Sequence, residues 1–96
     1  MMRKEDYLRK LKLLHDELKR FKVREIGLFG SVVRGEQKLT SDLDVLVDFA
    51  DDADLFDLVG LGLFLEEKLG CKVDVVPRRA LRQELRDQVL KEVVTV

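Results

Sequence analysis

Two aspartates, two positions apart, are the residues best placed to do chemistry in this 96-residue sequence. Asp42 and Asp44 alternate with Leu43 and Val45, the period-2 pattern of a strand with one polar and one apolar face. Because side chains two apart on a strand point the same way, both carboxylates would project from one face. Two such carboxylates either raise the pKa of one of them or share divalent cations, and hard oxygen ligands suit Mg²⁺. The pair therefore indicates a candidate magnesium site.

A third carboxylate stands in a later apolar stretch. Asp74 lies between Val73 and Val75, in a segment that we expect to form another short strand. If this strand lies beside the first, three carboxylates converge on one site. Such a set can hold two metal ions that stabilise the attacking and leaving oxygens of an in-line phosphoryl displacement.

A Gly-Ser pair followed by an arginine could bind the phosphates that this reaction needs. Gly30 and Ser31 follow an apolar stretch, where they offer close backbone approach and unpaired N–H donors. Arg34, one turn later, could clamp a phosphate oxygen. By itself the pair is weak evidence, because such residues end many strands for steric reasons. Its weight comes from its combination with the three carboxylates.

Apolar spacing predicts the elements that must position these residues. Tyr7, Leu11, Leu14, Leu18 and Phe21 recur at spacings of four and three, which predicts a helix over residues 5–21. Further helices are expected over 55–69, with Asp54 as the cap, and over 79–91. Strands are expected over 23–29, 43–49 and 72–76, and an edge strand over 93–96. This alternation predicts an α/β fold with a single sheet.

Length and composition narrow the class of protein. Ninety-six residues make about one small domain, so we expect a single domain over 1–96. The longest apolar run, 58–65, is far shorter than the roughly 20 residues that span a bilayer, so no membrane association is expected. One cysteine, Cys71, and a charged N-terminal segment favour a cytoplasmic protein over a secreted one.

The net charge of −1 conceals a strong segregation of charge. Residues 41–57 hold seven aspartates and no basic residue. Beyond Asp42 and Asp44, we interpret these acids as solvated loop and helix-start positions. Four later arginines could form a basic face for an acidic partner, but we interpret them as surface positions: Arg78, Arg79, Arg82 and Arg86. The near-neutral total does not favour direct binding of nucleic acid.

Three motifs follow one another along the chain: GSVVRGE at 30–36, SDLDVLV at 41–47 and VDVV at 73–76. This ordered set resembles the minimal nucleotidyltransferase family of the polymerase-beta-like superfamily. The family pattern is G-S, a turn with R-G, S-D-x-D in a strand and an acidic residue on a neighbouring strand, and the sequence departs from it at none of these positions. The resemblance covers nearly the whole chain. It implies an α/β (α+β) fold in which helices flank a small mixed sheet.

The resemblance also implies a role for each candidate residue. Gly30 and Ser31 would hold the β- and γ-phosphates of a nucleotide, with Arg34 as a further phosphate contact. The three aspartates would be catalytic and would bind two Mg²⁺ ions, and Asp74 would also take the proton from the attacking hydroxyl. The hydroxyl would attack the α-phosphate of a nucleoside triphosphate, for which ATP is the expected substrate, and pyrophosphate would leave.

A protein partner is the last implication of the resemblance. Many such proteins are antitoxins whose toxin is a HEPN-domain ribonuclease, and they move AMP onto a tyrosine hydroxyl of that toxin. Two alternatives stay open: transfer to a small hydroxylated molecule with a separate acceptor-binding subunit, and a non-catalytic antitoxin that acts by binding. The homo- or hetero-oligomeric state also stays open.

Overall fold

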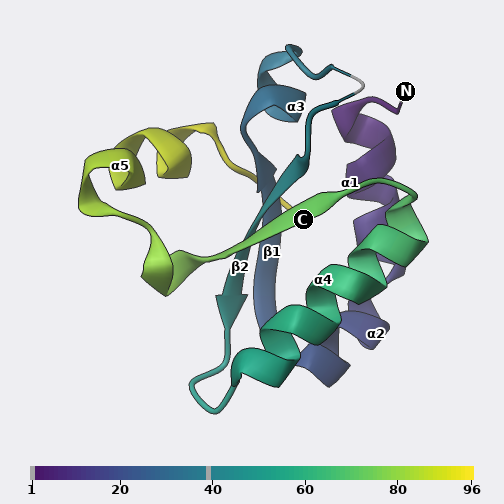
Figure 1. The fold of residues 1–96 in the computed structure, drawn as a ribbon, viewed down its shortest axis with the longest axis vertical. Coiled ribbons are helices and arrows are strands. Elements are labelled where there is room, and N and C mark those ends of the chain that lie inside the picture. Colours follow the sequence, from purple (N-terminus) through teal and green to yellow (C-terminus); the bar gives the residue numbers. More distant parts are fainter. Residues whose placement is uncertain (1, 39) are drawn as a thin grey trace.

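A four-stranded sheet lies at the centre of the computed structural model, which describes residues 2–38 and 40–96 (Figure 1). Its strands are β1 (Val23–Phe29), β2 (Leu43–Phe49), β3 (Val73–Pro77) and β4 (Val94–Thr95), in the order β3-β2-β1-β4. β1 is antiparallel to both β2 and β4, whereas β2 and β3 are parallel. The expected mixed α/β sheet with flanking helices is therefore confirmed.

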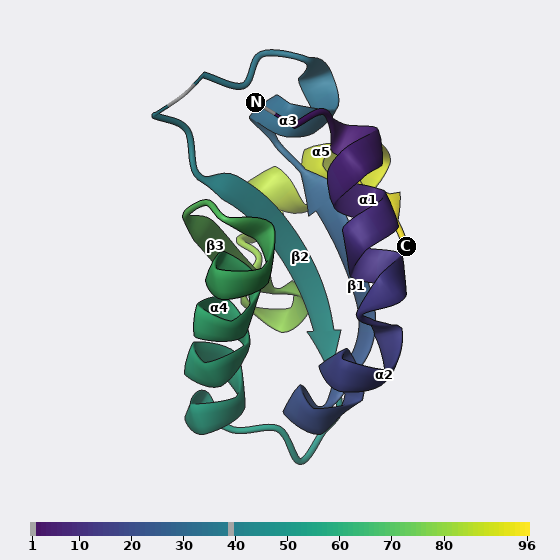
Figure 2. The same cartoon turned by 90° about the vertical axis from the view of Figure 1, so that its right-hand side faces the viewer.

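The core lies between one face of this sheet and the helices α1 (Lys4–Leu13), α2 (His15–Leu18) and α4 (Leu55–Leu69). Figure 1 shows these helices to the right of the sheet and α5 (Gln83–Glu92) to its left, and in Figure 2 α5 lies behind the sheet. The largest fully buried side chains come from both layers: Leu11, Leu28, Leu43, Leu61, Leu65, Val45 and Val47. Each contributes about 1.5–3 kcal/mol on leaving water. The hydrophobic core therefore packs against one face of β2, the strand that carries Asp44.

The first helical segment is not continuous, contrary to the single helix expected over 5–21. The backbone at Leu14 takes φ −89° and ψ 6°, so α1 ends there, and the chain continues as α2 and a 3₁₀ turn, η1 (Lys19–Phe21). The apolar positions still serve one core, because Tyr7, Leu11 and Leu18 are all buried. Periodicity predicted the buried side but not the break.

Helix α4 begins and ends at the residues that the sequence indicated. The Asp57 N–H donates to Asp54 Oδ1 at 3.1 Å, and the Asp54 N–H donates to Asp57 Oδ2 at 3.0 Å, which forms a reciprocal cap. Gly70 ends the helix with a φ of +69°, a conformation that favours glycine. The prediction of a helix over 55–69 is confirmed.

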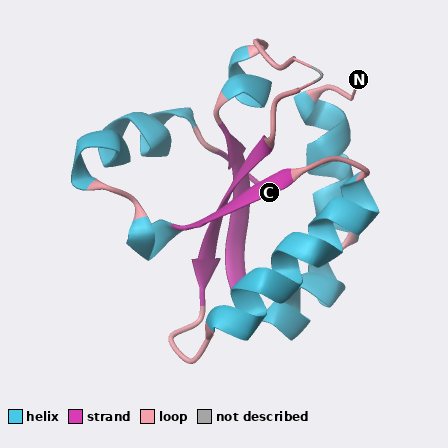
Figure 3. Ribbon diagram, in the orientation of Figure 1, coloured by secondary structure: helices cyan, strands magenta, loops and turns pink. Residues whose placement is uncertain are grey.

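The C-terminal helix starts later than the sequence indicated. A 3₁₀ turn, η2 (Arg78–Ala80), follows β3, and Arg82 is extended before α5 begins. Figure 3 shows α5 joined to the rest of the chain by a loop on each side. The edge strand at the C-terminal end is confirmed as β4. No helix in the described parts of the chain is long and apolar enough to cross a membrane.

Candidate active site

The parallel pairing of β2 with β3 brings two of the candidate carboxylates to one place. Asp44 and Asp74 are register partners. Partner residues on neighbouring strands point to the same face, and the strands lie about 4.7–4.9 Å apart. Asp42 lies just before β2, where the Leu43 N–H donates to the Lys72 carbonyl at 2.9 Å. All three candidate aspartates therefore belong to the same end of the sheet.

Gly30 lies against Asp44, because Phe29, the residue before Gly30 on β1, is the register partner of Asp44 on β2. Gly30 has φ +78° and ψ −151°, a conformation that is essentially restricted to glycine. A Cβ at this position would collide with Oδ2 of Asp44 and lie 3.0 Å from its Cγ. Glycine is therefore needed here both for backbone conformation and for space.

The Asp44 carboxyl stands in an electrostatically unfavourable place. Burial raises its pKa above the ordinary range, the charges of Asp74 and Asp42 raise it further, and Arg34 opposes them. The charge of Glu92 adds to the repulsion. A half-buried carboxylate surrounded by like charges is the setting that a bound cation relieves.

The side chains do not form a closed metal cage. Within residues 2–38 and 40–96, no group of three His, Cys, Asp or Glu side chains is arranged to hold a metal ion. Asp42 and Asp74 are exposed, whereas Asp44 is half-buried. The donor chemistry nevertheless fits Mg²⁺, which takes few carboxylates and completes its shell with water and phosphate oxygens. The assignment of all three aspartates as metal ligands stays a prediction.

Ser31 and Arg34 lie at the two ends of a one-turn helix, α3 (Ser31–Arg34). Val32 anchors this turn, since its side chain is buried in the core. The chain then turns at Gly35, whose φ is +72°. The Gly-Ser pair thus stands at the junction of a buried strand and an anchored turn, beside Asp44.

Glu92, the last residue of α5, is a part of this site that sequence reasoning missed. The Gly30 N–H donates to Glu92 Oε2 at 2.8 Å, and Nη1 of Arg34 donates to Glu92 Oε1 at 2.7 Å. This pairing raises the pKa of the Arg34 guanidinium, with help from Glu36. The usable signal in the sequence was weak: an acidic residue in the last turn of a helix opposes the helix dipole and so implies a partner elsewhere.

The other acids of the 41–57 segment lie at the opposite end of β2. Lys22 pairs with Asp52 and Asp57 at 3.5 and 3.7 Å, and Arg24 pairs with Asp51 at 3.6 Å. Basic residues therefore neutralise part of this group. The structure separates the acidic segment into two clusters with different surroundings.

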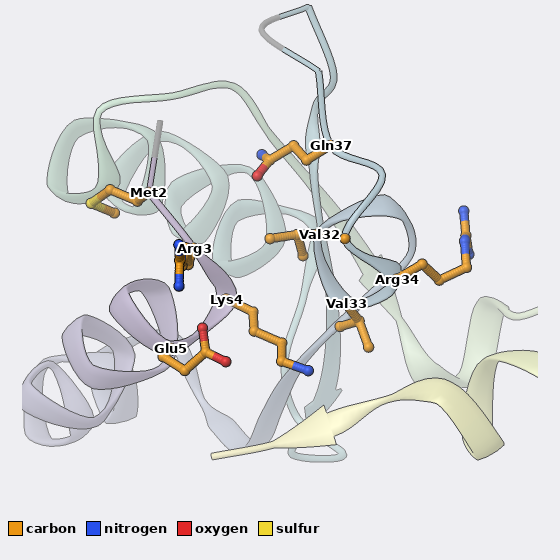
Figure 4. Close-up of a pocket in the computed structure, with 9 residues that line it drawn as sticks. Met2, Arg3, Lys4, Glu5, Val32, Val33, Arg34 and Gln37 are labelled. Atoms are coloured by element: carbon orange, nitrogen blue, oxygen red, sulfur yellow. The ribbon is translucent and has the colours of Figure 1, made fainter.

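A hollow of about 420 Å³ lies between the start of α1 and the turn α3 (Figure 4). Met2, Lys4, Val33 and Arg34 are among the residues that line it, and the Arg34 side chain extends away from the other three. None of the candidate aspartates contributes to its lining. We therefore locate the candidate site by its charged groups, at Gly30 and the ends of β2 and β3, and not by this hollow.

Comparison with known proteins identifies the family. Residues 11–96 match the family model described as a nucleotidyltransferase domain. The chain belongs to the nucleotidyltransferase family. It is similar to the protein adenylyltransferase MntA of Thermococcus cleftensis, with 49% identity over 77 residues that cover 80% of this chain and 78% of the relative.

Solved structures agree with this membership. One described as a minimal nucleotidyltransferase has a TM-score of 0.86 and 38% identity, and covers 99% of this chain and 97% of its own. A structure of a toxin–antitoxin with AMP-PNP has a TM-score of 0.70 and 34% identity, and the match covers 88% of this chain and 67% of that chain. A complex of tri-AMPylated Shewanella oneidensis HEPN toxin with MNT antitoxin has a TM-score of 0.66 and 29% identity, and the match covers 98% of this chain and 71% of that chain. The predicted family and enzyme class are confirmed: this is a minimal nucleotidyltransferase of the polymerase-beta-like superfamily.

Proposed function

We propose that this minimal nucleotidyltransferase moves AMP from ATP to a hydroxyl of a partner protein, in a reaction that depends on Mg²⁺. The observation that carries the proposal is the register pairing of Asp44 with Asp74 beside Gly30. Two carboxylates next to a backbone that can approach a phosphate closely are the parts that phosphoryl transfer needs. The related adenylyltransferase and the AMPylated toxin complex support adenylyl transfer in particular.

Each residue of the site has a part in this proposal. Gly30 and Ser31 receive the β- and γ-phosphates, because the Gly30 N–H already binds an anion, the Glu92 carboxylate, and glycine allows a phosphate to approach the backbone closely. Arg34 adds a guanidinium, a group suited to phosphate oxygens. Asp42 and Asp44 supply the principal metal ligands, and Asp74 completes the set. When bound, Mg²⁺ neutralises the charge of the transferring phosphate and lowers the pKa of the attacking hydroxyl.

The reaction proceeds by a single displacement. The acceptor oxygen attacks the α-phosphorus, the bond from that phosphorus to the bridging oxygen breaks, and pyrophosphate leaves. Asp74 takes the proton of the acceptor hydroxyl, since it lies beside Asp44 and is exposed to solvent on the edge strand β3. Positioning and charge neutralisation supply most of the rate enhancement.

An exposed apolar face on α4 supports a protein acceptor over a small molecule. Leu55, Phe56, Val59 and Leu63 are 69%, 86%, 53% and 64% exposed. Their spacing places them within one face of the helix. Apolar side chains gathered in this way on a surface mark sites of protein contact. We propose a HEPN-domain toxin as the partner, which would make this chain the antitoxin of the pair.

The test is to incubate the protein with Mg²⁺, labelled ATP and the HEPN-domain protein encoded next to it. Transfer of label to the partner, lost in Asp42→Asn and Asp44→Asn, supports catalysis. Asp48→Asn is a matched control, because Asp48 is also half-buried and on the polar face of β2, but near its other end. A partner that is neutralised equally by both site variants and never labelled would refute the enzymatic proposal and favour an antitoxin that acts by binding.

A further inference from the structure

The carboxylate of Glu92 occupies the donors that the proposed function assigns to nucleotide phosphates. One oxygen accepts from the Gly30 N–H at 2.8 Å, and the other accepts from the Arg34 guanidinium at 2.7 Å. The Glu92 side chain is 15% exposed and that of Arg34 is 43% exposed, so the carboxylate is more shielded from water than the guanidinium. A carboxylate bound by a backbone N–H and a guanidinium resembles a phosphate in charge and in the arrangement of its acceptors.

Glu92 and a triphosphate cannot use these donors together. The Gly30 N–H has one hydrogen to donate, and it is engaged. A phosphate beside the carboxylate would also add a like charge to a site that already holds the carboxylates of Glu92 and Asp44. Nucleotide binding therefore requires Glu92 to leave.

Helix α5 makes few contacts with the rest of the chain. Residues 83–88 are exposed, and Val89 is the buried residue of the helix. Before it the chain is extended at Arg82, and after it β4 pairs with β1 at two register positions. The dipole of α5 also disfavours a carboxylate at its C-terminal end, so Glu92 depends on Gly30 and Arg34 for its stabilisation.

We propose that Glu92 is an internal competitor of the nucleotide: it fills the phosphate position in the nucleotide-free protein, and the incoming β- and γ-phosphates displace it and loosen the end of α5. This inference rests on the proposed function, because it takes Gly30 and Arg34 as the phosphate donors. After transfer, the return of Glu92 helps to expel pyrophosphate. Glu92 thus affects how tightly the site holds linked phosphates, without acting on the reacting atoms.

The test compares the wild-type protein with Glu92→Gln by calorimetric titration of AMP-PNP in the presence of Mg²⁺. Loss of the competing charge should tighten binding on the order of tenfold. Glu84→Gln, in the exposed first turn of α5, is the matched control and should leave the affinity unchanged. Pyrophosphate should show the same preference for the variant, whereas AMP, which has no β- or γ-phosphate, should not.

A second measurement needs no variant. AMP-PNP with Mg²⁺ should speed hydrogen exchange at the amides of residues 89–95 in the wild-type protein, because Glu92 no longer holds them to Gly30. Equal or weaker binding of AMP-PNP by Glu92→Gln, or unchanged or slower exchange at 89–95, would overturn the role of Glu92 while the proposed function stands. If neither protein binds AMP-PNP or pyrophosphate, the proposed function falls as well, and this inference with it.

Discussion

The Asp44 carboxylate occupies the space in which a side chain at Gly30 would begin. Asp44 is placed there by its register pairing with Phe29, and Gly30 accommodates it with a positive φ. The candidate metal ligand and the backbone proposed to bind phosphate are therefore in direct contact. A side chain added at Gly30 would therefore displace the Asp44 carboxylate.

Gly30→Ala should impair the site more than the fold. The added Cβ would push the Asp44 carboxylate aside, and a misplacement of about 1 Å can reduce transfer about 100-fold. The strained backbone should also cost about 1–3 kcal/mol of unfolding free energy. Urea unfolding and a transfer assay measure the two effects.

Gly70→Ala is the control for that experiment. Gly70 also has a positive φ, but a Cβ there would meet no atom within 4 Å. It should lose about 1–2 kcal/mol of stability and retain full transfer activity. Equal losses of activity in the two variants would show that backbone strain alone, and not the contact with Asp44, explains the effect.

Asp44→Asn should stabilise the metal-free protein at neutral pH. Because burial and like charges raise the pKa of the Asp44 carboxyl in the folded state, the folded protein binds this proton more readily than the unfolded chain. The contribution of this proton to stability is complete below the ordinary value of 3.8 and is lost as the pH rises through the raised pKa. Urea unfolding in EDTA should therefore show a gain for Asp44→Asn at pH 7 that shrinks toward pH 3, and a loss at pH 7 would contradict this electrostatic account.

Mg²⁺ together with AMP-PNP should raise the melting temperature of the wild-type protein. A ligand that binds only the folded state stabilises it by mass action. Asp44→Asn should reduce the shift sharply, because its amide is a poorer ligand than a carboxylate. Thermal melts with and without EDTA measure this effect, and an identical shift in the two proteins would remove Asp44 from the metal site.

The exposed face of α4 should contribute to binding of the partner. Replacing Phe56 and Leu63 by serine should weaken the complex with the HEPN-domain protein by about tenfold or more, since buried apolar anchors each contribute over about 1 kcal/mol. Leu13→Ser is the matched control, because Leu13 is 80% exposed on α1. Calorimetric titration measures the affinity for the partner. If Leu13→Ser weakened binding as much as the double variant, the face of α4 would not be the binding surface.

Sequence patterns could predict the strands because the signal for each is local. The alternation around Asp44 indicated β2 and its polar face, and the cap at Asp54 indicated the start of α4. The break at Leu14 was not predictable from periodicity, since the apolar spacing continues across it. The contact of Glu92 with Gly30 joins residues 62 positions apart, and no local pattern encodes such a distance.

Adenylyl transfer to the partner protein should depend on the carboxylates of this site. The most direct measurement is the intact mass of the HEPN-domain protein after incubation with ATP, Mg²⁺ and either Asp44→Asn or Asp48→Asn. The partner should gain one or more AMP groups with Asp48→Asn and none with Asp44→Asn. An unchanged mass with the wild-type protein, or equal modification by both variants, would contradict the claim.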